Sequence, residues 1–98
     1  MLTTLERRWL QDARRSVRLA LVKTEIGDWD TVVACIKTIV RTTLVTNATL
    51  EVTNLLASLA SSNPSELRGN ASMRAASIRR LEETKSFIGD ILVATTDR

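Results

Sequence analysis

The sequence has no histidine and only one cysteine, Cys35. A zinc site needs several His or Cys ligands, and a Cys–His nucleophile needs both residue types, so this chain can assemble neither. A lone cysteine also rules out an internal disulfide and fits a reducing compartment. Aspartate and glutamate are the remaining acid–base groups, and they fall at predicted helix caps and borders instead of converging. We therefore expect a protein that is not an enzyme, with no catalytic residues, no metal site and no cofactor.

Residues that make turns are scarce, since the chain has three glycines and one proline, and its aromatic residues are Trp9, Trp29 and Phe87. This scarcity argues against a fold of many short strands and favours a few long helices. Hydrophobic residues make up 44% and charged residues 26%, which are ordinary values for a globular protein. With 98 residues, we expect one all-α domain that spans residues 1–98.

The first predicted helix covers about residues 3–24. Thr3 or Thr4 can cap its start, and Gly27 punctuates its end. Its apolar residues recur at intervals of three and four, which is one face of an α-helix. They are Leu2, Leu5, Trp9, Ala13, Val17, Ala20 and Leu21.

No apolar run in the chain approaches the length of a membrane span. The first fifteen residues lack the apolar centre of a secretory signal, and Glu6 and Asp12 count against an Arg-rich transit peptide. We therefore expect a cytoplasmic protein (in the host cytoplasm, if it is viral) that has no membrane partner.

A second helix is predicted over about residues 29–60, because no glycine or proline interrupts this stretch and Asp28 can cap it. The sequence leaves open whether this helix is kinked at Thr46 and Asn47. Apolar residues occupy two sides of this helix, and a helix that is apolar on two sides is usually covered on two sides. A small monomer has little to cover it with, so an antiparallel homodimer that buries this helix against its copy is expected. A self-contained three-helix bundle is the alternative.

The end of the chain predicts one more helix. Asn63 can cap a short turn in which Pro64 takes the first helical position, and Gly69 breaks that turn. A final helix follows at about residues 71–94, with an apolar stripe of Ala71, Ala75, Ile78, Leu81, Ile88 and Leu92. The expected fold is therefore all-α: two long antiparallel helices and a shorter C-terminal helix, assembled as a helical-bundle homodimer.

The positive charge of the chain is unevenly placed. Residues 1–41 hold eight Lys or Arg and five acids, whereas residues 42–98 hold six of each. In the first predicted helix, the arginines fall opposite the apolar stripe, on one exposed ridge without neutralising acids. They are Arg7, Arg8, Arg14, Arg15 and Arg18. Such a ridge indicates a polyanion or an acidic partner, although a merely solvated face is the plainer reading.

Lys37 and Arg41 stand four residues apart on the second predicted helix and can extend this basic surface. Duplex RNA is recognised by shape and by contacts to its backbone, which suits a rigid helical face with basic side chains. Single-strand binding normally needs exposed rings on which bases stack, and aromatic residues are scarce here. The expected RNA-binding residues are therefore Arg7, Arg8, Arg14, Arg15, Arg18, Lys37 and Arg41.

Two stretches, DWDTVVAC (28–35) and SIRRLEETK (77–85), and the order of elements between them resemble the small dsRNA-binding silencing suppressors of insect nodaviruses. The resemblance implies an all-helical antiparallel dimer that lies along duplex RNA without sequence preference and shields viral RNA from host dicing. It also implies that Lys37 and Arg41 contact RNA. The chain departs from that family in concentrating its positive charge in the first helix.

The leading hypothesis is sequence-independent binding of double-stranded RNA by a homodimer that acts as a viral suppressor of RNA silencing. A host RNA-silencing protein is a further partner to consider. The alternative is a small helical protein–protein interaction module, an adaptor or an inhibitor, that does not bind nucleic acid. The Thr-rich, nearly uncharged flank of the predicted 29–60 helix favours this alternative.

Overall fold

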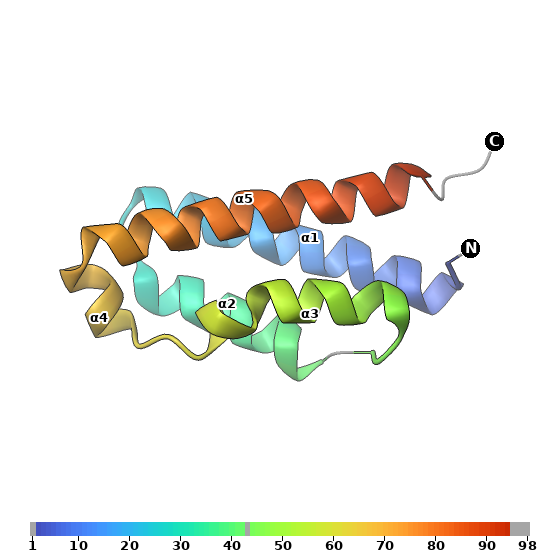
Figure 1. The fold of residues 1–98 in the computed structure, drawn as a ribbon, viewed down its shortest axis with the longest axis horizontal. Helices are drawn as coiled ribbons and strands as arrows, with labels where there is room; N and C mark the ends of the chain where they lie inside the picture. Colours follow the sequence, from blue (N-terminus) through green and yellow to red (C-terminus); the bar gives the residue numbers. More distant parts are fainter. Residues whose placement is uncertain (1, 43, 95–98) are drawn as a thin grey trace.

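The structure is a computed structural model that describes residues 2–42 and 44–94 (Figure 1). All of the regular secondary structure in these residues is helical, so the expected all-α class is confirmed. The five helices are α1 (Thr4–Glu25), α2 (Trp29–Arg41), α3 (Asn47–Ala60), α4 (Pro64–Gly69) and α5 (Ala71–Ala94).

Both ends of α1 follow from local sequence. Thr3 is the N-cap, and it forms a capping box in which its backbone N–H donates to Glu6 (2.8 Å) and its hydroxyl accepts from the Glu6 N–H (3.0 Å). The hydrogen bonds from Thr3 and Thr46 hold the pKa of Glu6 below its ordinary value. At the other end Gly27 has φ +74°, and the Asp28 N–H donates to the Lys23 carbonyl (3.0 Å). This left-handed glycine closes α1 and turns the chain into α2.

The prediction of a single helix over residues 29–60 is wrong. This stretch forms two helices, α2 and α3, that pack against each other. Thr42 ends α2, and its hydroxyl donates to the Thr38 carbonyl (2.9 Å). Thr46 then starts α3 as a capping residue with Thr49 as its partner, and the buried Thr49 hydroxyl also donates to the Leu44 carbonyl. Because threonine hydroxyls satisfy the free backbone groups at both ends, the chain reverses direction without glycine or proline.

This reversal changes how the apolar residues of the stretch are covered. Val32 and Ile36 of α2 and Val52 and Leu56 of α3 are fully buried, and they belong to one core. On α3, Val52, Leu56 and Leu59 are therefore covered within the chain, whereas Val45, which precedes this helix, is 77% exposed. The argument for a homodimer that buries a single long helix does not apply to the folded chain.

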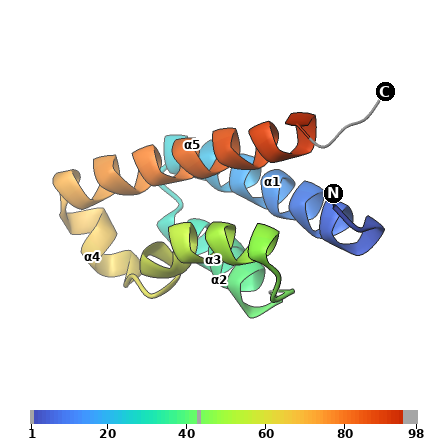
Figure 2. The same ribbon diagram turned by 45° about the vertical axis from the view of Figure 1, so that its right-hand side comes forward.

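The helices form two pairs. In both views α1 and α5 lie together as the upper pair, and α2 and α3 lie as the lower pair (Figures 1 and 2). The start of α1 and the end of α5 lie at the same end of the molecule, and α4 lies at the other end (Figure 1). Leu10 and Val17 of α1 and Leu81 and Ile88 of α5 are completely buried between the pairs. One face of α1 and one face of α5 remain on the outside.

The C-terminal part of the chain begins as expected, but its last helix is not shorter than the others. Asn63 caps α4, Pro64 takes its first turn, and the Arg68 guanidinium donates to Asp30 at 2.9 Å, which ties α4 to α2. With 24 residues, α5 is the longest helix. Ala71 and Ala75, which were placed in its apolar stripe, are exposed.

The buried side of α1 is rotated relative to the expected stripe. Leu10 is completely buried, whereas Leu5 is 60% exposed. The reason is that α1 is covered from two directions, by α2 and by α5. This rotation brings one flank of the arginine ridge against α5.

Candidate nucleic-acid interface

The arginines of α1 share one helix but not one environment. Arg8, Arg15 and Arg18 are exposed, and Arg7 and Arg14 are half-buried. Regular helical geometry from Thr4 to Glu25 fixes their directions, because side chains three or four residues apart lie on the same side. The ridge therefore divides into a part that faces α5, a part that faces solvent, and a part near α2.

Arg14 is the residue that faces α5. Its guanidinium lies against Gly89, so that a Cβ added at Gly89 would stand 3.1 Å from Nη2 and 3.3 Å from Cζ of Arg14. The Nε of Arg14 is buried and has no hydrogen-bond partner among the described residues. The absent side chain of Gly89 thus provides the space in which the Arg14 guanidinium rests.

A shallow groove of about 420 Å³ runs beside Arg14 between α1 and α5. Three guanidinium groups, one carboxamide and one apolar side chain line it: Arg14, Arg15, Arg18, Gln11 and Leu92. Guanidinium groups stay protonated at any physiological pH and bind phosphate oxygens through two parallel N–H groups. The groove therefore has the chemistry of a site for phosphate groups.

The expectation that no acid neutralises the arginines of this helix is wrong for Arg15, which is paired within the chain. Arg15 contacts Asp12 at 3.3 Å, and the two side chains are 80% and 61% exposed. Such an exposed pair stabilises the fold by only about 0.2–1 kcal/mol, so Arg15 can exchange Asp12 for another anion at little cost. In the described part of the chain, neither Arg14 nor Arg18 is within ion-pair distance of a carboxylate.

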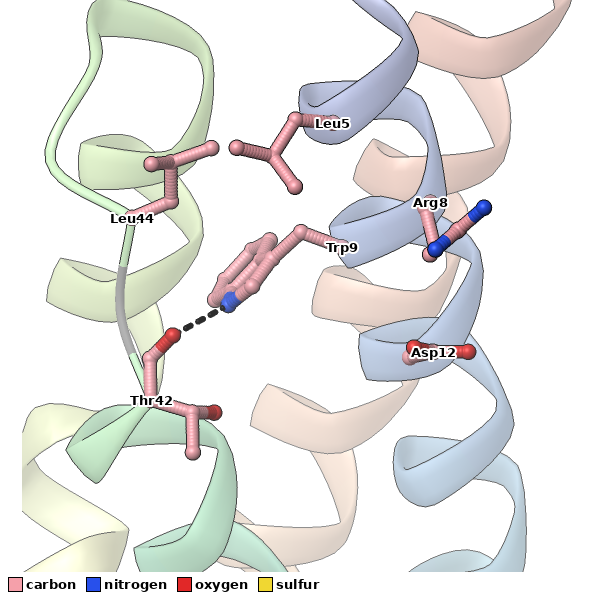
Figure 3. A pocket seen from close by; sticks show the side chains of 6 residues that line it. All are labelled: Leu5, Arg8, Trp9, Asp12, Thr42 and Leu44. Atoms are coloured by element: carbon pink, nitrogen blue, oxygen red, sulfur yellow. Dashed lines mark hydrogen bonds between the residues drawn. The ribbon is translucent and has the colours of Figure 1, made fainter.

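Arg8 borders a different hollow, on the α2 side of α1. This pocket of about 300 Å³ is lined by Leu5, Arg8, Trp9, Asp12, Thr42 and Leu44. Leu5 and Leu44 point toward one another across it, and the Trp9 indole N–H donates to the Thr42 carbonyl at 2.8 Å (Figure 3). The hydrogen bond satisfies a carbonyl at the end of α2, which gives Trp9 a structural role.

Lys37 and Arg41 are exposed but belong to another side of the molecule. The side of α2 that borders α1 carries Thr38 and Thr42. Lys37 and Arg41 instead continue the helical line of Asp30, which binds Arg68 of α4. The structure therefore does not join these two residues to the arginines of α1 in one continuous strip.

The aromatic rings offer no stacking platform. Trp29 is only 3% exposed, Trp9 and Phe87 are half-buried, and all three pack in or against the core.

Burial raises the pKa of the Cys35 thiol, so it stays protonated at neutral pH and is a poor nucleophile.

No group of three or more His, Cys, Asp or Glu among the described residues could hold a metal ion. None of the helices they form is both long and apolar enough to cross a membrane.

Sequence reasoning identified the arginines of the groove but missed two of its features. The contact of Gly89 with Arg14 has no signal in the sequence, because it depends on which helices pack together. Gln11 is not among the predicted site residues, although it lines the groove together with the arginines. The chain matches no protein-family model, no curated protein and no solved structure.

Proposed function

We propose that this protein binds double-stranded RNA without reading its sequence, through the groove that Arg14, Arg15 and Arg18 line on α1. The observation that carries the proposal is this cluster of three guanidinium groups with a carboxamide, held on a rigid helix. A rigid basic row meets the regularly spaced phosphates of a duplex, and Gln11 can donate to and accept from ribose hydroxyls.

The placement of the aromatic rings supports a duplex rather than a single strand. Proteins that bind single strands stack bases on exposed rings, and the three rings of this chain are used in the core. A protein that coats duplex RNA shields it from dicing enzymes, which is the activity that the resemblance to the nodavirus suppressors implies. Suppression of RNA silencing is therefore the biological role that we propose.

The test is binding of a labelled duplex RNA, a duplex DNA and the separate RNA strands, each at two or more salt concentrations. If three arginines neutralise three phosphates, log affinity falls with log salt with a slope of about −2.7, using the B-form value of about −0.9 per phosphate. The variant Arg14→Ala with Arg18→Ala should reduce this slope to about −0.9 and weaken binding to every duplex sequence alike.

Lys37→Ala with Arg41→Ala is the matched control, because it removes the same charge from another side of the molecule. It should weaken binding clearly less than the α1 variant does. Equal affinity for single strands and duplexes, or equal losses in the two variants, would contradict the proposal.

A second candidate function is a protein-interaction module. The observation that favours it is a row of exposed apolar side chains at the end of α1, with Leu19 46%, Val22 54% and Ile26 68% exposed. Phosphates do not bind such a row. Copurification distinguishes the two functions, because nucleic acid that is lost after treatment with a duplex-specific ribonuclease supports RNA binding.

A further inference from the structure

The outer side of α1 carries an ordered pattern of charge. Arg15, Arg18, Val22 and Glu25 follow one another at intervals of three and four residues, so they form one line along the helix. All four are exposed, and Val22 is 54% exposed. Read toward the C-terminus, this line is positive, positive, apolar and negative.

The outer side of α5 carries charges of the opposite sign in the reverse order along the helix. Arg79, Glu82, Ser86 and Asp90 also recur at intervals of three and four residues, and all are exposed. The helix starts with exposed alanines, of which Ala75 lies one turn before Arg79. Read toward the C-terminus, this line is apolar, positive, negative, polar and negative.

α1 and α5 run in opposite directions (Figures 1 and 2), and the Arg14 guanidinium lies against Gly89, so we take Arg14 and Gly89 as level along the helix axes. A twofold axis parallel to the helices would lay α1 of one copy over α5 of a second copy without changing this register. At a rise of 1.5 Å per residue, Arg15 then lies about 3 Å along the axis from Asp90, and Arg18 lies about 4.5 Å from Glu82. Both offsets are shorter than one helical turn.

The same operation pairs the remaining charges with the opposite sign. Glu25 comes about 1.5 Å along the axis from Arg79 of the second copy, and Ile26 comes near its Ala75. Three pairs of opposite charge and an apolar end therefore match at once. Because the axis is twofold, every match occurs twice.

We propose that the outer face of α1 and α5 is a self-association surface, and that its partner is a second copy of this chain. The face is about 33 Å long, from the 22 residues of α1, and about 20 Å wide for two adjacent helices. Its footprint of roughly 660 Å² approaches the area of about 800 Å² per partner that stable interfaces bury. Arg15, Asp12 and Glu82 are exposed and Lys85 is half-buried, so the existing pairs Arg15–Asp12 and Glu82–Lys85 exchange partners at little cost.

This inference does not rest on RNA binding, although both use Arg15 and Arg18. A dimer of this kind covers the basic groove with carboxylates, so a second copy and a duplex exclude each other from it. The dimer also differs from the one expected through residues 29–60, because its interface is made by α1 and α5.

The experiment uses two charge-reversed variants of the full chain, whose masses are measured by sedimentation equilibrium at low salt. In Arg15→Glu with Arg18→Glu, α1 becomes acidic and repels the acidic α5 of another copy. In Glu82→Arg with Asp90→Arg, α5 becomes basic and repels α1. Each variant alone should dissociate at least about tenfold more readily than the unmodified protein. An equimolar mixture should form a heterodimer, because each altered helix then faces its complement.

Lys37→Glu with Arg41→Glu is the control, since it makes an equal charge change away from the face and should leave the dimer intact. Circular dichroism verifies that each variant is folded, as expected for exposed positions. An unmodified protein that stays monomeric at about 100 μM, where a micromolar complex would form, overturns the proposal. So do reversed variants that remain dimeric, and a mixture that associates no better than its components.

Discussion

Substitution of Gly89 by alanine tests the contact that Gly89 of α5 makes with Arg14 of α1, beside the groove. Alanine in a helix interior is more favourable than glycine by about 0.5–1 kcal/mol, because glycine loses more backbone freedom on folding. The new Cβ, however, would stand 3.1 Å from Nη2 and 3.3 Å from Cζ of Arg14, closer than carbon and nitrogen atoms normally approach. The guanidinium must move outward by a few tenths of an ångström.

The expected net effect follows from these two opposing quantities. Moving a long side chain away from its preferred rotamer costs about 0.5–1.5 kcal/mol. The gain and the cost nearly cancel, so Gly89→Ala should leave the free energy of unfolding within about 0.5 kcal/mol of the unmodified value. In an Arg14→Ala background the crowding is absent, and the same substitution should stabilise the protein by about 1 kcal/mol, or about 4–8 °C in Tm.

Urea denaturation of the four proteins in this double-mutant cycle measures the coupling between the two positions. Gly69→Ala is the control, because no atom lies within 4 Å of a Cβ placed there, and its effect should not depend on Arg14. Distant sites add to within about 0.3–0.5 kcal/mol, so a coupling of that size or smaller between Gly89 and Arg14 would refute the contact.

Three further substitutions test the core, the contact between α1 and α2, and a helix cap. Leu56→Ala removes a completely buried side chain of α3 and should lower the free energy of unfolding by about 2–5 kcal/mol in urea denaturation; a loss below about 1 kcal/mol would mean that α3 is not packed in the core. Trp9→Phe removes the hydrogen bond to the Thr42 carbonyl and should cost about 1 kcal/mol in the same assay, whereas unchanged stability would contradict that bond. Hydrogen bonds from Thr31 lower the pKa of Asp28 from its ordinary value of 3.8, so its contribution is present above pH 3.8 and is lost as the pH falls through the lowered value. Asp28→Asn keeps an acceptor without this titration, so unfolding at pH 7 and pH 3 should show a smaller loss of stability in acid than in the unmodified protein, and an equal loss would contradict the assignment.

The helix ends that rest on local chemistry were predictable from the sequence. Thr3, Asp28 and Asn63 each cap the helix that their position predicted, because a cap needs only a side-chain acceptor within three residues of a free N–H. The break between α2 and α3 has a local signal too, since Thr46 and Thr49 form a capping pair. That signal was outweighed by the absence of glycine and proline, which are sufficient but not necessary to end a helix.

The tertiary environment of the arginines was not predictable in the same way. Periodicity placed Arg14 on an exposed ridge, yet its direction relative to the core depends on how many neighbours cover α1. Two neighbours rotate the buried side toward Leu10 and place Arg14 over Gly89. The sequence pattern of a helix shows which residues share a face, but it does not show which other helices pack against that face.

Because a second copy and duplex RNA would use the same arginines, the acids of α5 separate the two activities. Arg15→Glu with Arg18→Glu should abolish both, since it removes the positive groups that either partner needs. Glu82→Arg with Asp90→Arg should prevent self-association but add four units of positive charge beside the groove, so duplex RNA should bind more tightly and with a steeper dependence on salt. Anisotropy titration of a labelled duplex measures this affinity, and sedimentation of the same variant measures its mass. An affinity for RNA that falls together with self-association would mean that RNA binds the dimer, and the two partners would then not compete.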